Sequence, residues 1–253
     1  MTSQINIDVV RVFTDDSGAF GNELGIVRSS SDTAGREQAI AARLGFSETV
    51  FIDALRGDAS LGVAAVIRIF TPAAELPFAG HPSVGAAWWL AREGLPVAVL
   101  AEGAGDVAVR YDGEVTWITG RASWAPEFEW VPVETPAAVD AIRAEHFTSG
   151  HHYVWSWVDE PNGVLRSRMF APDMGIVEDE ATGAAAVRIT ALLGRGLDIR
   201  QGRGSRIVTR LVSEADGRVG VAADIRVEVG GRAVFDRMIA LDIEPGAGPS
   251  IDV

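Results

Sequence analysis

Two segments that lie far apart in the chain share one pattern of residues. RIFTPAAELPFAGHPSVGAA at 68–87 aligns, with a short gap, with RMFAPDMGIVEDEATGAAA at 168–186. Both begin with Arg, an apolar residue and Phe, reach a Pro, pass through a variable turn and end in Gly-Ala-Ala. The elements expected around the two segments also follow nearly the same order. The pattern predicts a duplicated unit with a cleft between its two copies.

Hydrophobic periodicity predicts an α+β fold for the duplicated unit. Each repeat segment leads into an apolar helix, expected over 82–94 in the first copy and over 182–194 in the second. Two more helices are expected over 33–46 and 136–147. The remaining apolar runs are typical of strands, and those at 96–103 and 105–120 are typical of a meander.

The composition and hydrophobic periodicity of the sequence change at residue 121. The stretch RASWAPEFEWVPVETP mixes proline, acidic and aromatic residues without a steady period, which is typical of a domain boundary. We therefore expect an N-terminal half at 1–120 and a C-terminal half at 121–253. Near the C-terminus, separate strands are expected at 218–231 and 232–244. The last of them could return to pack on the first half.

Composition excludes several chemistries and partners. The chain has no cysteine and no lysine, and all 22 basic residues are arginine, so thiolate nucleophiles, disulfides and lysine Schiff bases are excluded. The net charge of -13 disfavours nucleic acid and anionic membranes as partners. No apolar run approaches the width of a bilayer, and the start of the sequence lacks the layout of a signal peptide. We expect a cytoplasmic protein that acts on a small molecule.

The repeat also predicts two small-residue turns, AGHPSVG and DEATGAA, at the starts of helices. The first turn of a helix has unpaired N–H groups and a partial positive charge, so it can bind an anion without a basic side chain. If the two starts face each other, Gly80, Gly85 and Gly183 would let a carboxylate reach the backbone. The alternative is that these turns are ordinary helix caps, with Thr182 as an N-cap residue.

Three residues are candidates for proton transfer. Glu48 opens a strand after a helix-ending glycine, so its carboxylate could point into the cleft; a surface position is the alternative. Asp179, between two other acidic residues, could orient a neighbouring acid or base, or could favour the helix dipole. His81 lies in the turn of the first copy, where a structural role is the alternative. Metal binding is disfavoured because no second histidine falls at ligand spacing from His81.

Five segments, taken in order, resemble one known family. FTDDSGAFGNELGIV, SETVFI, RIFTPAAELPFAGHPSVGAA, EDEATGAAA and VEVGGRAV are similar to the motifs of the PhzF family, the phenazine-biosynthesis isomerase group that shares the diaminopimelate epimerase fold. The resemblance runs through nearly the whole chain. It implies two pseudo-symmetric domains, each a curved, mostly antiparallel sheet wrapped around a central helix, and usually a homodimer.

The resemblance also implies a site and a reaction. Ala79 and Ala181 take the positions of the two cysteines of the related epimerases, so proton transfer would pass to Glu48. This carboxyl would take a proton from carbon and return it elsewhere, with a pKa raised by a closed apolar cleft. His81 and Asp179 would assist, and no cofactor or metal would be needed. The substrate-binding residues implied are Asn22, Gly80, Thr182, Gly183 and Ala184.

Departures from the family pattern bear on the substrate. Ala184 replaces the serine of EDPATGS, GNELG at 21–25 replaces GNPxAV, and QGxxxGRPS is contracted to QGRGSR at 201–206. A small carboxylate other than the phenazine precursor, dihydro-hydroxyanthranilate, is therefore expected. A lyase that uses the same base, and a metabolite-binding protein without turnover, are the alternatives.

A separate hypothesis concerns the His151-His152 pair. Aligning the strands VFI and YVW across the repeat places His151 opposite Glu48, where it could be a second proton donor. The alternative is that one histidine faces inward and the other outward on a strand.

Overall fold

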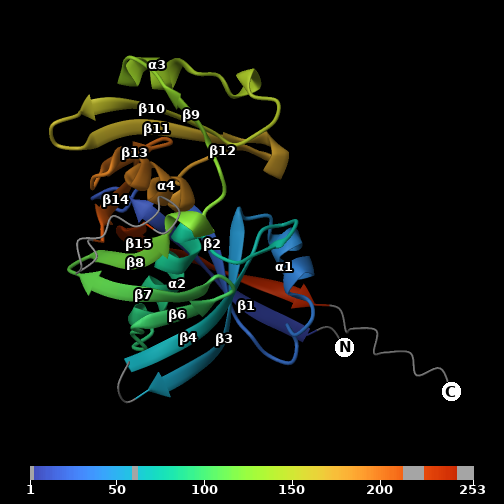
Figure 1. Cartoon of the computed structure of the whole chain (residues 1–253). Coiled ribbons are helices and arrows are strands. Elements are labelled where there is room, and N and C mark those ends of the chain that lie inside the picture. The colour runs from blue at the N-terminus through green and yellow to red at the C-terminus, as the bar shows by residue number, and fades with distance from the viewer. Residues whose placement is uncertain (1–2, 59–61, 213–224, 244–253) are drawn as a thin grey trace.

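The computed structural model describes residues 3–58, 62–212 and 225–243 (Figure 1). The strands are β1 Ser3–Thr14, β2 Asn22–Arg28, β3 Glu48–Asp58, β4 Gly62–Phe70, β5 Glu75–Leu76, β6 Val99–Glu102, β7 Gly105–Asp112, β8 Val115–Arg121, β9 Glu129–Pro132, β10 His152–Asp159, β11 Val164–Ala171, β12 Ile176–Asp179, β13 Asp198–Gln201, β14 Ser205–Leu211 and β15 Arg226–Ile243. The α-helices are α1 Glu37–Leu44, α2 Gly80–Arg92, α3 Pro136–Ala141 and α4 Gly183–Leu193.

The pairing of the strands repeats between the two halves. In the first half β2–β3 is parallel, β3–β4 antiparallel, β4–β6 parallel and β6–β7 antiparallel. The second half repeats this alternation: β9–β10 is parallel, β10–β11 antiparallel, β11–β13 parallel and β13–β14 antiparallel. Each half also has a short strand, β5 or β12, just before its apolar helix. The predicted duplicated α+β fold is confirmed.

The two halves share one long strand. The start of β15 pairs with β8 on one side and β14 on the other, whereas the rest of β15 pairs with β1. The pairing with β1 closes β1–β2–β3–β4–β6–β7–β8–β15 into a ring of strands around α2. The chain's last described segment therefore packs on its first. The division of the chain at residue 120 stays a prediction.

The expected break between two C-terminal strands is wrong, because β15 continues through Gly230 and Gly231. A Cβ atom at Gly230 would lie 2.5 Å from the Trp117 ring, and one at Gly231 would lie 2.4 Å from the Phe13 ring. The glycines therefore make room for two aromatic rings in an extended strand and do not form a turn. Residues 218–224 of the first expected strand lie outside the described residues.

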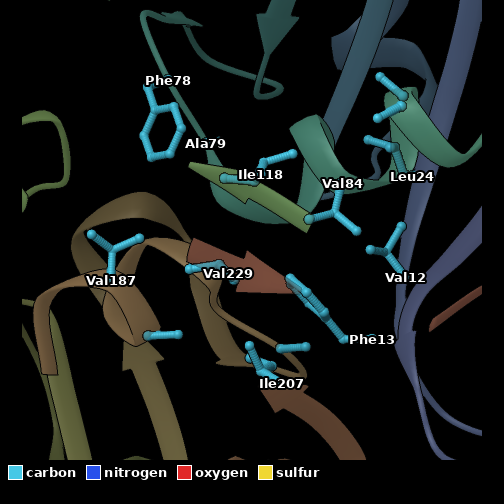
Figure 2. Packing of buried hydrophobic residues seen from close by; sticks show 14 of the residues in the cluster. Val12, Phe13, Leu24, Phe78, Ala79, Val84, Ile118, Val187, Ile207 and Val229 are labelled. Atoms are coloured by element: carbon cyan, nitrogen blue, oxygen red, sulfur yellow. The ribbon is translucent and has the colours of Figure 1, made fainter. Parts of the chain in front are cut away.

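The core is continuous between the halves. Both α2 and α4 are apolar on most sides, as expected of helices enclosed by sheet. Figure 2 shows Val84 of α2 and Val187 of α4 in the same cluster of buried side chains as Val229 of β15. Burying a valine contributes about 1.5–3 kcal/mol. This shared core holds the two helices in fixed positions.

The helix expected over 136–147 is shorter than predicted. The α-helix α3 ends at Ala141, and a separate 3-10 turn follows at Ala144–His146. Thr135 caps α3 and Pro136 starts it, but the backbone of Ile142 is extended and interrupts the helix. Within the described residues, no helix combines the length and apolar character needed to cross a membrane. The homodimer implied by the resemblance stays a prediction.

Candidate active site

The starts of α2 and α4 touch head to head. A Cβ atom built on Gly80 would lie 2.8 Å from the Gly183 backbone, and one built on Gly183 would lie 2.8 Å from Gly80 Cα and His81 N. Only glycine fits at both positions, because real Cβ atoms do not approach backbone so closely. Two partially positive helix ends therefore meet at one place, where an anion would be stabilised.

Gly85 does not belong to this meeting point. It lies in the second turn of α2, and a Cβ atom there would lie 2.5 Å from Leu24 and 2.7 Å from Val12. The expectation that Gly85 opens space for a ligand is wrong, because the residue makes space for β1 and β2. The sequence repeat aligns the Gly-Ala-Ala run at Gly85 with the one at Gly183. In the structure the helices instead begin at Gly80 and Gly183, so Gly80 is the counterpart of Gly183.

Glu48 and His81 face each other next to this contact. Glu48 begins β3 beside Leu24 of the parallel strand β2, and His81 is the second residue of α2. Glu48 Oε2 lies 3.5 Å from His81 Nε2. Both atoms are buried and neither has a hydrogen-bond partner. Buried polar atoms are rarely left unpaired, so the two atoms are available to a ligand.

Burial determines the protonation of this pair. It raises the pKa of Glu48 to about 7, opposed by a hydrogen bond from Ser47. It lowers the pKa of His81 to about 4, opposed by the charge of Asp179 and a hydrogen bond to the Glu23 backbone. At neutral pH His81 is therefore uncharged, so the short contact is not an ion pair. Because Nε2 has no hydrogen-bond partner, the bond to Glu23 uses the other ring nitrogen and leaves Nε2 as an acceptor.

Asp179, at the end of β12, completes the group. Its Oδ1 accepts a hydrogen bond of 2.6 Å from Asn22 Nδ2, and its Oδ2 accepts one of 2.6 Å from Thr182 Oγ1. These bonds lower the pKa of Asp179, but burial and repulsion from Glu48 are larger and raise it. Thr182 is the N-cap residue of α4, yet its hydroxyl bonds Asp179 and makes no cap hydrogen bond to the helix.

Gln201 is a site residue that the sequence analysis missed. Its buried Nε2 donates to Thr182 Oγ1 at 2.8 Å and to the Asp179 carbonyl at 2.9 Å. Since Thr182 accepts from Gln201, its single hydrogen is directed at Asp179. In the sequence, Gln201 and Gly202 stand out only as part of a contracted family motif. Its position next to the site follows from the pairing of β13 with β11.

The acidic neighbours of Asp179 have other partners. Glu178 forms two hydrogen bonds of 2.7 Å with Arg168. Glu180 accepts hydrogen bonds from Ser205 and from the backbone and side chain of Arg203. Both carboxylates therefore bond residues outside α4.

The remaining predicted positions lie around the helix contact. Ala79 is the N-cap residue of α2, and Ala181 is fully buried and accepts a hydrogen bond from Asn22. Ala184 is half-buried in the first turn of α4. In the residues that the structure covers, no group of three or more His, Cys, Asp or Glu side chains is arranged to hold a metal ion.

The two adjacent histidines point to different neighbours. His151 lies 6.2 Å from the Phe128 ring between centroids, and His152 stacks on Phe147 and lies 3.3 Å from Glu129. In the described part of the chain, no hydrogen bond or ion pair joins His151 to Glu48. The proposal that His151 is a second proton donor stays a prediction, and the contacts around it do not support it.

The sequence matches one protein family along most of its length. The model of the PhzC-PhzF family, described as phenazine biosynthesis-like protein, matches residues 10–158 and 139–237. Trans-2,3-dihydro-3-hydroxyanthranilate isomerase of Pseudomonas chlororaphis is 31% identical over 85% of this chain and 91% of its own. The enzyme of the same name from Pseudomonas aeruginosa is 28% identical over 78% of this chain and 86% of its own.

Solved structures show the same fold. The PhzF-family protein of Bacillus anthracis superposes with a TM-score of 0.75 at 20% identity, over 95% of this chain and all of the other. A probable proline racemase from Agrobacterium radiobacter superposes with a TM-score of 0.60 at 13% identity, over 98% and 94%. The duplicated fold is thus shared with this probable racemase. From its sequence matches and its fold, the chain belongs to the PhzC-PhzF family of phenazine biosynthesis-like proteins.

Proposed function

We propose that this isomerase moves a proton between carbon atoms of a small carboxylate, with Glu48 as the acid and base. The observation that carries the proposal is the buried, unpaired contact of Glu48 Oε2 with His81 Nε2 beside two helix starts. That the protein is an isomerase follows from its family relatives. The residue roles that follow are our assignment.

The proton transfer is balanced within the substrate. The Glu48 carboxylate takes a proton from carbon, so that a C–H bond breaks and an O–H bond forms. The electron pair moves through an adjacent double bond, and the same proton is then returned to another carbon. A pKa of about 7 suits both steps, because the acid and the base forms are both populated near neutral pH.

His81 and Asp179 would orient Glu48 and the substrate for the proton transfer. Uncharged His81 presents an acceptor nitrogen to Glu48 or to a polar group of the substrate. Asp179 is held by Asn22 and Thr182, so its carboxylate is fixed before the substrate arrives. Fixed groups of this kind reduce the reorganisation needed in the transition state.

The substrate carboxylate would bind at the contact of Gly80 with Gly183. Two helix starts each carry roughly half a positive charge, and their backbone N–H groups point in the same direction as the dipole. The nearby ionisable side chains are Glu48, Asp179 and His81, the last of which is uncharged at neutral pH. The anion would therefore rely on backbone donors.

The test is hydrogen exchange in D2O. We would incubate the protein with amino and hydroxy carboxylates, including trans-2,3-dihydro-3-hydroxyanthranilate, and follow deuterium uptake by NMR and mass spectrometry. The variant Glu48→Gln should lower exchange at least about a hundredfold, because it removes the base. Glu134→Gln, at an exposed glutamate, is the matched control and should exchange like the wild type.

The outcomes separate the alternatives. Exchange that persists in Glu48→Gln would reject Glu48 as the base. Loss of a group from the substrate together with exchange would identify a lyase that uses the same base. Thermal stabilisation by a carboxylate without exchange would identify a binding protein.

A further inference from the structure

Another buried carboxyl group lies next to the start of α2, outside the group formed by Glu48, His81 and Asp179. Glu102 is the last residue of β6, and its Oε1 lies 2.6 Å from the hydroxyl oxygen of Ser83. Its Oε2 is buried and has no hydrogen-bond partner. An ionised carboxylate in such a place would lose its hydration without a compensating positive charge.

The Ser83 hydroxyl has two close neighbours and a single hydrogen. Ser83 Oγ lies 2.7 Å from the Ala79 carbonyl and 2.6 Å from Glu102 Oε1. A hydroxyl donates one hydrogen, and both neighbours are acceptors if Glu102 is ionised. Both short contacts are hydrogen bonds only if Glu102 carries a proton and donates it to Ser83, which then donates to Ala79.

This chain of bonds ends at the candidate site. Ala79 is the N-cap residue of α2, and its carbonyl also accepts the backbone N–H of Ser83. The next residues are Gly80, which touches Gly183, and His81, which faces Glu48. We propose that Glu102 is an uncharged, proton-donating positioning residue that holds the first turn of α2 through the Ser83 hydroxyl.

The surroundings agree with an uncharged Glu102. Burial raises the pKa of Glu102 to about 8, opposed only by the hydrogen bond that Ser83 can donate to the ionised carboxylate. No other ionisable side chain of the described residues contributes to this shift, although several lie on the elements beside β6. These are Arg68 on β4, His81 and Arg92 on α2, and Asp106, Arg110, Tyr111 and Asp112 on β7.

Loss of the proton would rearrange the turn. Ionised Glu102 can only accept, so the Ser83 hydrogen would turn from the Ala79 carbonyl to Glu102 Oε1. The start of α2 would then lose one of the two bonds that hold Ala79. Alkaline pH would thereby loosen the positions of Gly80 and His81.

The test follows the titration directly in solution. Protein labelled with 13C at glutamate carboxyl groups and with 15N at amides is titrated from acid to alkaline pH. The Glu48→Gln background removes the carboxyl whose pKa is raised to about 7, and the signal of Glu102 is assigned by its loss in Glu102→Gln. We expect a midpoint near 8 for the Glu102 carboxyl, and amide shifts of Gly80 and His81 with the same midpoint.

Two variants make the result specific. In Glu102→Gln the amide group can still donate to Ser83, so the Gly80 and His81 signals should stay at their neutral-pH positions through the titration. In Ser83→Ala the Glu102 carboxyl should still titrate, but the two amides should no longer follow it. A carboxyl midpoint near the ordinary 4.5, or amide shifts that persist unchanged in Glu102→Gln, would overturn the proposal.

A second readout rests on the proposed function. With Glu48 intact, the alkaline limb of kcat/KM should move to higher pH in Glu102→Gln, because residue 102 can no longer ionise. If the NMR titration is as expected but the alkaline limb of kcat/KM does not move, Glu102 affects only the structure of the turn and not catalysis. The NMR result does not need turnover, so failure of the isomerase mechanism would leave it unchanged.

Discussion

Gly80 and Gly183, the first residues of α2 and α4, are in backbone contact, and a methyl group on either would lie 2.8 Å from the other's backbone. The contact joins the two copies of the repeat at the place where both helix dipoles are positive. Two like partial charges side by side are unfavourable unless an anion relieves them. This junction is where we propose that the carboxylate of the substrate binds.

Alanine at either glycine should damage both stability and activity. Gly80→Ala and Gly183→Ala force backbone apart at the junction, which typically costs about 1–3 kcal/mol. Chemical denaturation and the exchange assay would measure the two effects. Gly57→Ala is the matched control, since a Cβ atom there meets nothing within 4 Å. An unchanged Gly80→Ala protein would mean that the helix starts are not in contact in solution.

Stability should fall as the pH rises above neutrality. Glu48 and Glu102 have folded-state pKa values of about 7 and about 8, raised from 4.5, so their contribution is present at low pH and is lost as pH rises through those values. His81, lowered from 6.5 to about 4, acts in the opposite sense, because its contribution is present above pH 6.5 and is lost toward pH 4. Between pH 4.5 and 6.5 the stabilising effects of the two carboxyls and of His81 change in opposite directions.

Above pH 6.5 the contribution of His81 no longer changes, and only those of Glu48 and Glu102 still depend on pH. The free energy of unfolding should therefore decrease by on the order of 2 kcal/mol between pH 6.5 and 8. Urea unfolding across this range would measure the decrease. The double variant Glu48→Gln with Glu102→Gln should flatten it. A slope that is equally steep in the double variant would assign the decrease to other groups.

Asn22 should matter through its bond to Asp179. Asn22→Ala removes the 2.6 Å donor, leaves a buried carboxylate short of one partner and should cost about 1–3 kcal/mol with a further rise in the pKa of Asp179. The acid limb of kcat/KM would report this rise. Asn162→Ala is the control, because Asn162 bonds Asp159 in an exposed turn. Equal effects of the two variants would contradict a special role for Asn22.

Ala184 should influence which carboxylate is accepted. Ala184→Ser restores the hydroxyl of the family motif in the first turn of α4, and one hydrogen bond to a charged group contributes about 1.5–3 kcal/mol. We expect KM for trans-2,3-dihydro-3-hydroxyanthranilate to fall about tenfold or more, with a smaller change in kcat. Ala42→Ser, on the exposed face of α1, is the control. No change in KM would place the substrate carboxylate elsewhere.

The predictions from sequence were most accurate where the signal is local. The repeat, the apolar helices and the glycine that ends α1 follow from spacing and residue type, and each is present in the structure. Glu48, His81 and Asp179, the three residues that the sequence predicts for proton transfer, lie together. The sequence does not point to Gln201 or Glu102, because nothing in their neighbouring residues distinguishes a buried partner of the site from a strand end.

By itself the sequence determined that the chain is a duplicated α+β protein with small-residue helix starts, since periodicity and repetition are read directly from the order of residues. Tertiary structure alone decided that Gly80, and not Gly85, meets Gly183, that Gly230 and Gly231 continue one strand, and that Ser83 joins Glu102 to α2. These contacts depend on the register between segments distant in the chain. Register is set when the shared core packs, which no single stretch of sequence encodes.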